Sequence, residues 1–319
     1  MTRGRQPMMR PTILCPVDFS DASRGAARYA RLIAEYFGSR LVMLAVEDPL
    51  LAEAADLSTG TGWTGADTRR ELARFVSPSL QGPPLKDIDI TYEVAVGKPA
   101  EQILRSAQSC DLIVMSTHGL TGMRKLFFGS TTERVLRETT IPVLTTPPTA
   151  EGPWALEEVR HLVGRILVPV DLSESSLRQV QIARAIAEAL GVPFIVTSVL
   201  EPIRSPFVAK LQLSSVELER KARAEDALAE LIATVPRRLH PEALVAYGDP
   251  AEEISKTARD RQAGLIVLGL HGSPMFGARM GSVTYRVLCL APALVLALPP
   301  APHAAPPEAA AERRGLAHT

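Results

Sequence analysis

The fold is decided by a stretch that occurs twice, first as Ile13-Leu-Cys-Pro-Val-Asp-Phe-Ser20 and again as Ile166-Leu-Val-Pro-Val-Asp-Leu-Ser173. Six of its eight positions are identical in the two copies. Each copy is an apolar run that ends in an aspartate and a serine, a pattern typical of a buried strand leading into a helix. A repeat of this kind in a chain of 319 residues predicts two domains of about 150 residues each.

Three further pairs of motifs follow in the same order in each copy. They are Gly97-Lys-Pro-Ala-Glu101 with Gly248-Asp-Pro-Ala-Glu252, Leu112-Ile-Val-Met-Ser-Thr-His-Gly119 with Leu265-Ile-Val-Leu-Gly-Leu-His-Gly272, and Gly129-Ser130 with Gly281-Ser282. The aspartate and the glycine of the His-Gly pair are 101 residues apart in both copies. Four ordered matches indicate that one domain has been duplicated.

Short apolar runs alternate with amphipathic stretches within each copy. The apolar runs at 112–115 and 265–268 show no alternation, which is typical of strands buried on both faces of a parallel sheet. We therefore expect an α/β fold made of two tandem, doubly wound, open five-stranded parallel sheets with strand order 3-2-1-4-5, as in flavodoxin-like or Rossmann-like domains. In the first copy the patterns predict strands at 12–17, 40–46, 89–95, 111–116 and 142–146 and helices at 20–37, 66–77, 99–109 and 129–139; the longest helical pattern of the second copy is at 214–233.

Composition sets the predicted boundaries. We expect the first domain at 11–146 and the second at 164–298, joined by a linker at 147–163 that contains Pro147-Pro148 and Gly152-Pro153. The ends, 1–10 and the Ala- and Pro-rich 299–319, are predicted to be disordered tails. The connection at 48–65 is unusually long and is interpreted either as a lid or as an insertion.

Charge and cysteine usage exclude several classes of protein. Lysine and arginine total 35, as do aspartate and glutamate, so we expect no nucleic-acid partner and no anionic-membrane partner. No apolar stretch reaches the roughly 18 residues that span a bilayer, and no signal-peptide pattern is found at the N-terminus. Cys15, Cys110 and Cys289 are scattered and predict neither a disulfide nor zinc. The expected location is the cytoplasm.

An aspartate follows the first strand in each copy, Asp18 in one and Asp171 in the other. One interpretation is structural, because this position suits helix capping, with Ser20 and Ser173 as the caps. The other is functional: a carboxylate at the carboxyl end of a central strand can accept hydrogen bonds from a ligand, for example from the amino group of adenine.

The second candidate element follows the fourth strand. It runs from Ser116 to Gly119 and resumes after nine residues at Gly129-Ser130-Thr131-Thr132. The glycines permit close approach of a ligand, and the N-terminus of a helix favours a phosphate. The alternative is that Ser130 and Glu133 form a capping box that needs no ligand. The histidines before the loop glycines, His118 and His271, are interpreted as structural, and the loop cations Arg124, Lys125 and Arg279 either neutralise phosphate or are solvated.

Two other glycine-rich stretches do not fit phosphate-binding motifs. Gly60-Thr-Gly-Trp-Thr-Gly65 matches G-x-G-x-x-G but lacks the strand that must precede it, so we interpret it as a loop. Gly97-Lys98 is followed by Pro99 rather than by a hydroxyl residue and is not a Walker A motif.

These motifs resemble those of the universal stress protein family over residues 11–146 and 164–298. Nucleotide-binding members of that family carry G-x2-G-x9-G-[ST] after the fourth strand and an aspartate after the first. The resemblance implies that Asp18 contacts adenine, that Gly119 lines the path of the ribose and phosphates with Ser116 nearby, and that Gly129, Ser130 and Thr131 hold the phosphates. The counterparts in the second half are Asp171, Gly269, Gly272, Gly281 and Ser282.

Both halves depart from the family pattern. Ser116 stands in the place of the first glycine, and the second loop has eight residues, including Pro274, where the pattern has nine. One missing residue can displace backbone N–H groups by up to about 3.5 Å, so we expect the first domain to hold the ligand.

The resemblance implies a stress-response regulator that binds ATP, with Mg²⁺ as a candidate companion ion. We expect no catalytic residues and little turnover, because no positioned base or arginine finger is found in the sequence. The alternatives are a nucleotide-free interaction module and an enzyme of adenylate chemistry on a related fold, and sustained nucleotide turnover would favour the enzyme. The resemblance also implies that the fifth strands pair, here within one chain as a pseudo-dimer through Val143-Leu144 and Leu294-Val295-Leu296. Further association into a homodimer is left open.

Overall fold

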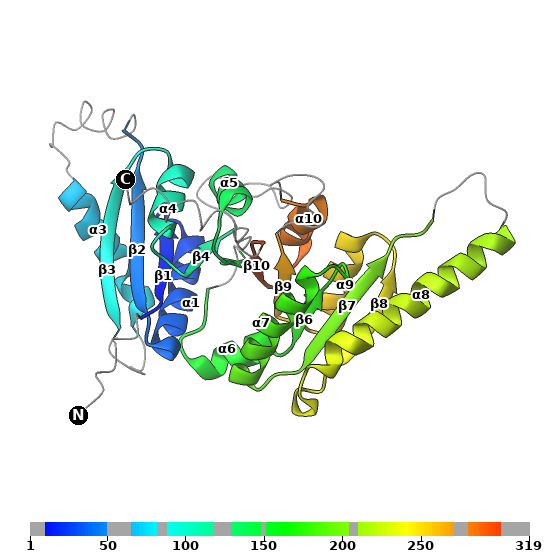
Figure 1. The fold of residues 1–319 in the computed structure, drawn as a ribbon. Coiled ribbons are helices and arrows are strands. Elements are labelled where there is room, and N and C mark those ends of the chain that lie inside the picture. The colour runs from blue at the N-terminus through cyan, green and yellow to red at the C-terminus, as the bar shows by residue number, and fades with distance from the viewer. Residues whose placement is uncertain are drawn as a thin grey trace, which may run out of the picture.

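The computed structural model describes residues 10–49, 65–81, 88–117, 129–147, 151–203, 210–270 and 280–300. Strands and helices alternate through both halves (Figure 1). Every strand and helix predicted for the first half is found, with ends shifted by at most three residues. The first half contains β1 (Thr12–Val17), α1 (Asp21–Phe37), β2 (Arg40–Glu47), α3 (Gly65–Leu80), β3 (Asp89–Val96), α4 (Pro99–Ala107), β4 (Leu112–Ser116), α5 (Ser130–Glu138) and β5 (Val143–Thr146).

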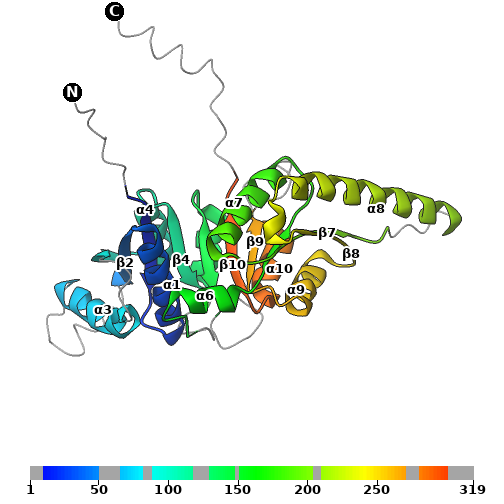
Figure 2. The same cartoon turned by 90° about the horizontal axis from the view of Figure 1, so that it is seen from below.

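The second half repeats this order. It is preceded by α6 (Leu156–Val163), a helix in the connection between the two halves. Its longest helix spans the pattern predicted at 214–233 and, in Figures 1 and 2, extends well beyond the sheet. The elements are β6 (Ile166–Pro169), α7 (Ser175–Leu190), β7 (Phe194–Leu200), α8 (Lys210–Ala233), a short 3₁₀ turn (Arg237–Leu239), β8 (Glu242–Tyr247), α9 (Pro250–Asp260), β9 (Leu265–Gly269), α10 (Ser282–Leu290) and β10 (Leu294–Leu298).

The strands form one ten-stranded sheet in the order β3-β2-β1-β4-β5-β10-β9-β6-β7-β8. Each half therefore has the predicted order 3-2-1-4-5, and all pairs within a half are parallel. β1 pairs with β4, and β6 pairs with β9. The strand order reverses between these strands, so each half has a switch point beside the residues that follow its first and fourth strands.

The two halves meet through their fifth strands, as the resemblance to the family implies. β5 and β10 pair antiparallel, with Leu296 opposite Leu144. The Thr145 hydroxyl, buried at this junction, donates to the carbonyl oxygen of Val295 at 3.3 Å. Because β5 of one half covers β10 of the other, the edge strands of the whole sheet are β3 and β8 rather than the fifth strands.

Helices cover both faces of the sheet, as a parallel sheet requires (Figure 2). In β1, Ile13 and Cys15 belong to the apolar core on one face, whereas Leu14 belongs to the core on the other. α1, α3, α7 and α8 contribute buried residues to the first core, and α4, α5, α9 and α10 contribute to the second. Each core runs through both halves, so the sheet and its two helix layers are continuous across the β5–β10 junction.

The segment that enters α6 is fastened to α1 of the first half. Arg28 donates to the carbonyl oxygen of Glu151 at 2.6 Å and its guanidinium lies 3.7 Å from the centre of the Trp154 ring. Arg31 donates to the carbonyl oxygen of Trp154 at 2.6 Å and pairs with Glu35, at 2.5 Å, inside the protein. These contacts hold the connection between the halves against the first domain. Among the described residues, no helix is long and apolar enough to span a bilayer.

Candidate functional site

Asp18 lies where β1 ends, and the chain turns sharply behind it. Its Oδ1 accepts hydrogen bonds from the Ser20 backbone N–H at 3.1 Å and from the Ser20 hydroxyl at 2.5 Å. Ser20 is the N-cap of α1, as predicted, and its Oγ accepts from the Ser23 N–H at 3.2 Å. Asp18 Oδ2 makes no hydrogen bond with the described residues. The aspartate therefore supports the capping turn with one oxygen and can present the other to a ligand.

The residue after this aspartate has a left-handed backbone in both halves. Phe19 has φ 62° and Leu172 has φ 60°, values that side chains other than glycine rarely adopt. Phe19 packs edge-on against Phe75 of α3, with ring centres 5.3 Å apart, and Arg24 lies over the same ring. No glycine marks this turn in the sequence, and the motif comparison missed it. The same conformation at both switch points indicates that the turn serves to place the aspartate.

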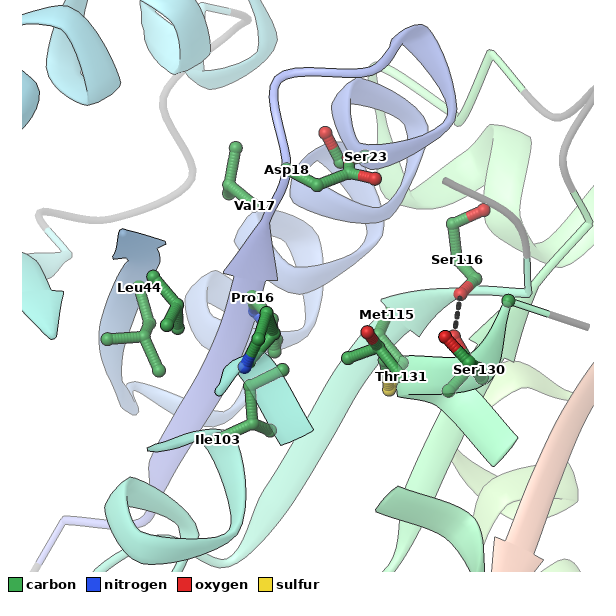
Figure 3. Close-up of a pocket in the computed structure, with 14 residues that line it drawn as sticks. Pro16, Val17, Asp18, Ser23, Leu44, Ile103, Met115, Ser116, Ser130 and Thr131 are labelled. Atoms are coloured by element: carbon green, nitrogen blue, oxygen red, sulfur yellow. Dashed lines mark hydrogen bonds between the residues drawn. The ribbon is translucent and has the colours of Figure 1, made fainter. Parts of the chain in front are cut away.

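The start of α5 is fixed to the end of β4 by two hydrogen bonds. The Gly129 N–H donates to the carbonyl oxygen of Thr117 at 3.1 Å, and the Thr132 hydroxyl donates to the carbonyl oxygen of Ser116 at 3.0 Å; Figure 3 shows the second as a dashed line at Ser116. The N-cap is Gly129, and no side chain caps the helix.

The predicted capping box at Ser130 is therefore wrong. Ser130 is already inside the helix, and the carboxylate of Glu133 accepts from Arg137 at 2.7 Å. A helix normally leaves its first N–H groups without an intrahelical partner, and here no side chain of the described residues takes the role of a cap.

Asp18 and the start of α5 line one cavity of about 260 Å³. Figure 3 shows Asp18 and Ser23 on one side of it, with Ser116, Ser130 and Thr131 on the other. Five predicted residues lie at the cavity, namely Asp18, Ser116, Gly129, Ser130 and Thr131. Gly119, His118 and the loop cations Arg124 and Lys125 lie outside the described residues. Sequence comparison missed the apolar wall of Leu44, Val46, Pro99, Ile103 and Met115, although Pro99 belongs to a repeated motif.

An equivalent cavity of about 450 Å³ occupies the second half. It is lined by Asp171, Gly269, Gly281 and Ser282, whereas Gly272, His271 and Arg279 lie outside the described residues. Asp171 Oδ1 accepts from the Ser173 N–H at 3.0 Å, but the predicted cap, Ser173, is wrong: the N-cap of α7 is Glu174. Gln179, which no motif indicated, also lines this cavity; its Nε2 donates to the carbonyl oxygens of Pro169 and Val267.

The shorter second loop does not displace the start of α10. The Gly281 N–H donates to the carbonyl oxygen of Leu270 at 3.0 Å, and the Thr284 hydroxyl donates to that of Gly269 at 2.9 Å. These bonds match those of Gly129 and Thr132 in the first half. The displacement expected from the missing residue is therefore not found at the helix, and the difference in length falls within 271–279, outside the described residues.

Ion pairs fasten each of these helices to the helix that precedes it. Arg134 of α5 contacts Glu101 of α4 at 3.0 Å, and Arg286 of α10 contacts Glu252 of α9 at 3.2 Å. Arg286 also donates to Asp249 at 2.5 Å, and this hydrogen bond, together with the one from the Glu252 N–H, holds the pKa of Asp249 below its usual value. Among the described residues, no group of three or more histidine, cysteine or acidic side chains could hold a metal ion.

The sequence matches the model of the universal stress protein family twice, over residues 9–147 and 163–299. The chain belongs to the universal stress protein family. It is a tandem member, because each match covers one of the two halves. One curated relative, a universal stress protein of Thermus aquaticus, is 33% identical over 138 residues, which are 43% of this chain and 98% of the relative. A single-domain universal stress protein is thus similar to half of this one.

Two solved structures share the fold of the tandem chain. A universal stress protein from Archaeoglobus fulgidus is 18% identical, with a TM-score of 0.59 over 90% of this chain and 98% of its own. A protein named as a putative universal stress protein from Pseudomonas aeruginosa is 19% identical, with a TM-score of 0.60 over 91% of this chain and 94% of its own. At these identities the likeness concerns the fold, including its two domains.

Proposed function

We propose that this universal stress protein binds an adenine nucleotide, ATP, in the cavity of its first domain and acts as a regulator in the stress response. The observation that carries the proposal is the position of Asp18 and the uncapped start of α5 on opposite sides of one cavity at the switch point (Figure 3). The site pairs a hydrogen-bond acceptor for the base with a helix N-terminus for the phosphates.

The proposed roles follow from the chemistry of each group. The Asp18 carboxylate accepts from the exocyclic amino group of adenine, and Leu44 and Val46 supply apolar contact for the base. Gly129, Ser130 and Thr131 receive phosphate oxygens through backbone N–H groups and hydroxyls, helped by the positive end of the helix dipole. Gly119 belongs to the same proposal through the sequence motif. Mg²⁺ would enter with the nucleotide, bound to its phosphates.

We propose binding without sustained turnover. Among the described residues that line the cavity there is no lysine, arginine or histidine, and Asp18 is the sole acidic residue. Phosphoryl transfer needs groups that position the nucleophile and stabilise the charge of the transition state. The bound nucleotide would therefore act by changing conformation or partner choice. The pairing of β5 with β10 supports an intramolecular pseudo-dimer as the functional unit.

One observation favours the alternative of a nucleotide-free interaction module. Asp18 Oδ1 is already engaged by Ser20, which gives the aspartate a structural role without a ligand. The alternative predicts that Asp18 can be replaced by asparagine, which still accepts at this turn, without any effect on nucleotide affinity.

The test is a titration of the full chain with ATP and magnesium, monitored by equilibrium dialysis, with ADP release measured in parallel. We expect saturable binding, loss of at least tenfold in affinity for Asp18→Asn, and no sustained release of ADP. Asp171→Asn, the same change in the second half, is the matched control and should leave the first site intact. Unchanged affinity in Asp18→Asn would favour the interaction module, and sustained ADP release would favour an enzyme.

A further inference from the structure

The two cavities share a backbone frame but differ in the groups that line it. Both have an aspartate after the first strand and a helix start held by one backbone and one threonine hydrogen bond. Within the described part of the two cavities, the differences are in side chains at equivalent positions. Three such differences point in the same direction.

The first difference is an additional carboxylate. Glu201, which follows β7, lines the second cavity together with Asp171. The strand registers place Leu44 opposite Pro16 and Thr197 opposite Pro169, so the equivalent of Glu201 is Asp48. Asp48 does not line the first cavity, which has Asp18 as its one acidic residue among the described ones. The described lining of the second cavity likewise holds no lysine, arginine or histidine, and Arg220 of α8, outside that lining, donates to the backbone carbonyl oxygen of Glu201 at 3.1 Å.

The second difference is a missing hydroxyl at the helix start. The hydroxyls of Thr132 and Thr284 both donate to carbonyl oxygens of the strands. That leaves Ser130 and Thr131 in the first cavity, but only Ser282 in the second, because Val283 takes the place of Thr131. The second helix start thus has one donor fewer for phosphate oxygens.

The third difference is on the wall that faces the base and sugar. Thr197 stands in the second cavity where the first has Leu44, and its hydroxyl donates to the carbonyl oxygen of Leu244 at 3.0 Å. Ser198 also lines the second cavity, and Val199 repeats the apolar Val46 of the first. The second cavity is also the larger, about 450 Å³ against about 260 Å³. Its capacity therefore does not restrict it to a smaller ligand.

We propose that the second cavity binds a nucleoside that carries at most one phosphate, and that it discriminates against ATP relative to the first cavity. The inference rests on the proposed function, because it assumes that the shared frame is a nucleotide site. Carboxylates accept hydrogen bonds from vicinal hydroxyls, so Asp171 and Glu201 suit a base and a ribose. The same two charges oppose a triphosphate, and at about 10 Å one charge changes the affinity for another on the order of tenfold.

The test uses the full chain with Gly129→Val, which adds a side chain at a residue that lines the first cavity, so that nucleotide binding is measured at the second cavity. This variant is titrated calorimetrically with adenosine, AMP and magnesium-ATP. We expect AMP and adenosine to bind at least tenfold more tightly than ATP. Glu201→Gln in the same background should raise the ATP affinity on the order of tenfold, and Val283→Thr should raise it further. Glu225→Gln, an exposed change on α8, is the charge-matched control and should alter nothing.

The reverse variant separates the two proposals. Gly281→Val should abolish the AMP and adenosine binding seen in the Gly129→Val chain, and an added Cβ there meets nothing closer than the Thr284 hydroxyl at 3.9 Å, so the fold should persist. If the Gly129→Val chain binds ATP as tightly as AMP, or binds neither, the inference is overturned. If the Gly281→Val chain fails to bind ATP at the first cavity, it is the proposed function that has failed.

Discussion

The Thr132 hydroxyl donates a 3.0 Å hydrogen bond to the carbonyl oxygen of Ser116, and this contact joins the start of α5 to the end of β4. Thr284 and Gly269 repeat it at 2.9 Å. Both threonines are buried, and the carbonyl that each one satisfies lies at the carboxyl end of a central strand. The candidate phosphate-binding end of each helix is held in place by this bond.

Thr132→Val should therefore loosen the start of α5. Valine has the same shape but leaves the Ser116 carbonyl without this donor, which costs about 1 to 2 kcal/mol of unfolding free energy. Urea denaturation measures the change, and nucleotide affinity should fall with it. Thr131→Val is the stability control, because the Thr131 hydroxyl makes no hydrogen bond with the described residues. Equal stability of the two variants would show that the bond does not hold the helix.

Substitution in the buried ion pair Arg31–Glu35 should lower the free energy of unfolding of the first domain strongly. Arg31 is 1% exposed and Glu35 is 4% exposed, so Arg31→Ala leaves a carboxylate buried without its partner. We expect a loss of about 3 to 5 kcal/mol and faster proteolysis of the segment that includes Glu151 and Trp154. Arg74→Ala, which removes an exposed pair with Glu71, should cost under about 1 kcal/mol. Similar losses in the two variants would contradict this account.

Gly264 should not tolerate a side chain. A Cβ at this position would lie 1.9 Å from the carbonyl oxygen of Leu162 and 2.9 Å from Val163 Cα, so the backbone at the end of α6 would have to move. Gly264→Ala should cost about 3 kcal/mol or more by thermal or chemical denaturation. Gly281→Ala is the matched substitution with open space around the new Cβ. Comparable stability of the two alanine variants would rule out the close approach.

Much of the fold could be predicted from the sequence because parallel strands buried on both faces are uniformly apolar. The pairing of Asp18 with the start of α5 could also be predicted, since the doubly wound order brings the first and fourth strands together. The left-handed turn at Phe19 could not, because it is accompanied by the packing of Phe19 on Phe75 and by the hydrogen bond from Ser20 to Asp18 rather than marked by a glycine.

Other features of the site depend on contacts between residues far apart in the sequence. The N-cap is Gly129 rather than Ser130, and the Thr132 hydroxyl in the first turn is bound to the Ser116 carbonyl, a contact over 16 residues. Arg31 reaches Trp154 across 123 residues, and no local pattern marks either partner. Gln179 replaces the small Ala26 at the equivalent position, and its role is visible only when both flanking strands are in place.

Alkaline pH should destabilise the protein through Cys15. Complete burial raises the pKa of this thiol from 9.0 to about 12. Above pH 9 the unfolded chain loses this proton while the folded chain keeps it, so stability falls as pH rises, by about 1.4 kcal/mol per pH unit toward pH 12. Cys15→Ala should flatten the decline between pH 9 and 11, measured by denaturation. The same slope in the variant would exclude the thiol as its source.

The β5–β10 junction should make the two domains unfold together. Leu144 and Leu296 are buried opposite each other across the antiparallel pair. Leu144→Asp places a charge in this apolar contact, and we expect the single unfolding transition to separate into two, seen by calorimetry. Val96→Asp, at a position 57% exposed on the edge strand β3, should leave one transition. One transition in both variants would mean that the Leu144–Leu296 contact is not what couples the unfolding of the two domains.

The most direct test of the central claim is a calorimetric titration of nucleotide-stripped protein with magnesium-ATP, in the wild-type chain and in Gly129→Val. The account predicts saturable binding at the first cavity of the wild-type chain and its loss in the variant, because Gly129 lines this cavity together with Asp18 and the substitution adds a branched side chain there. ATP binding that survives Gly129→Val unchanged, or no ATP binding by the wild-type chain, would contradict it.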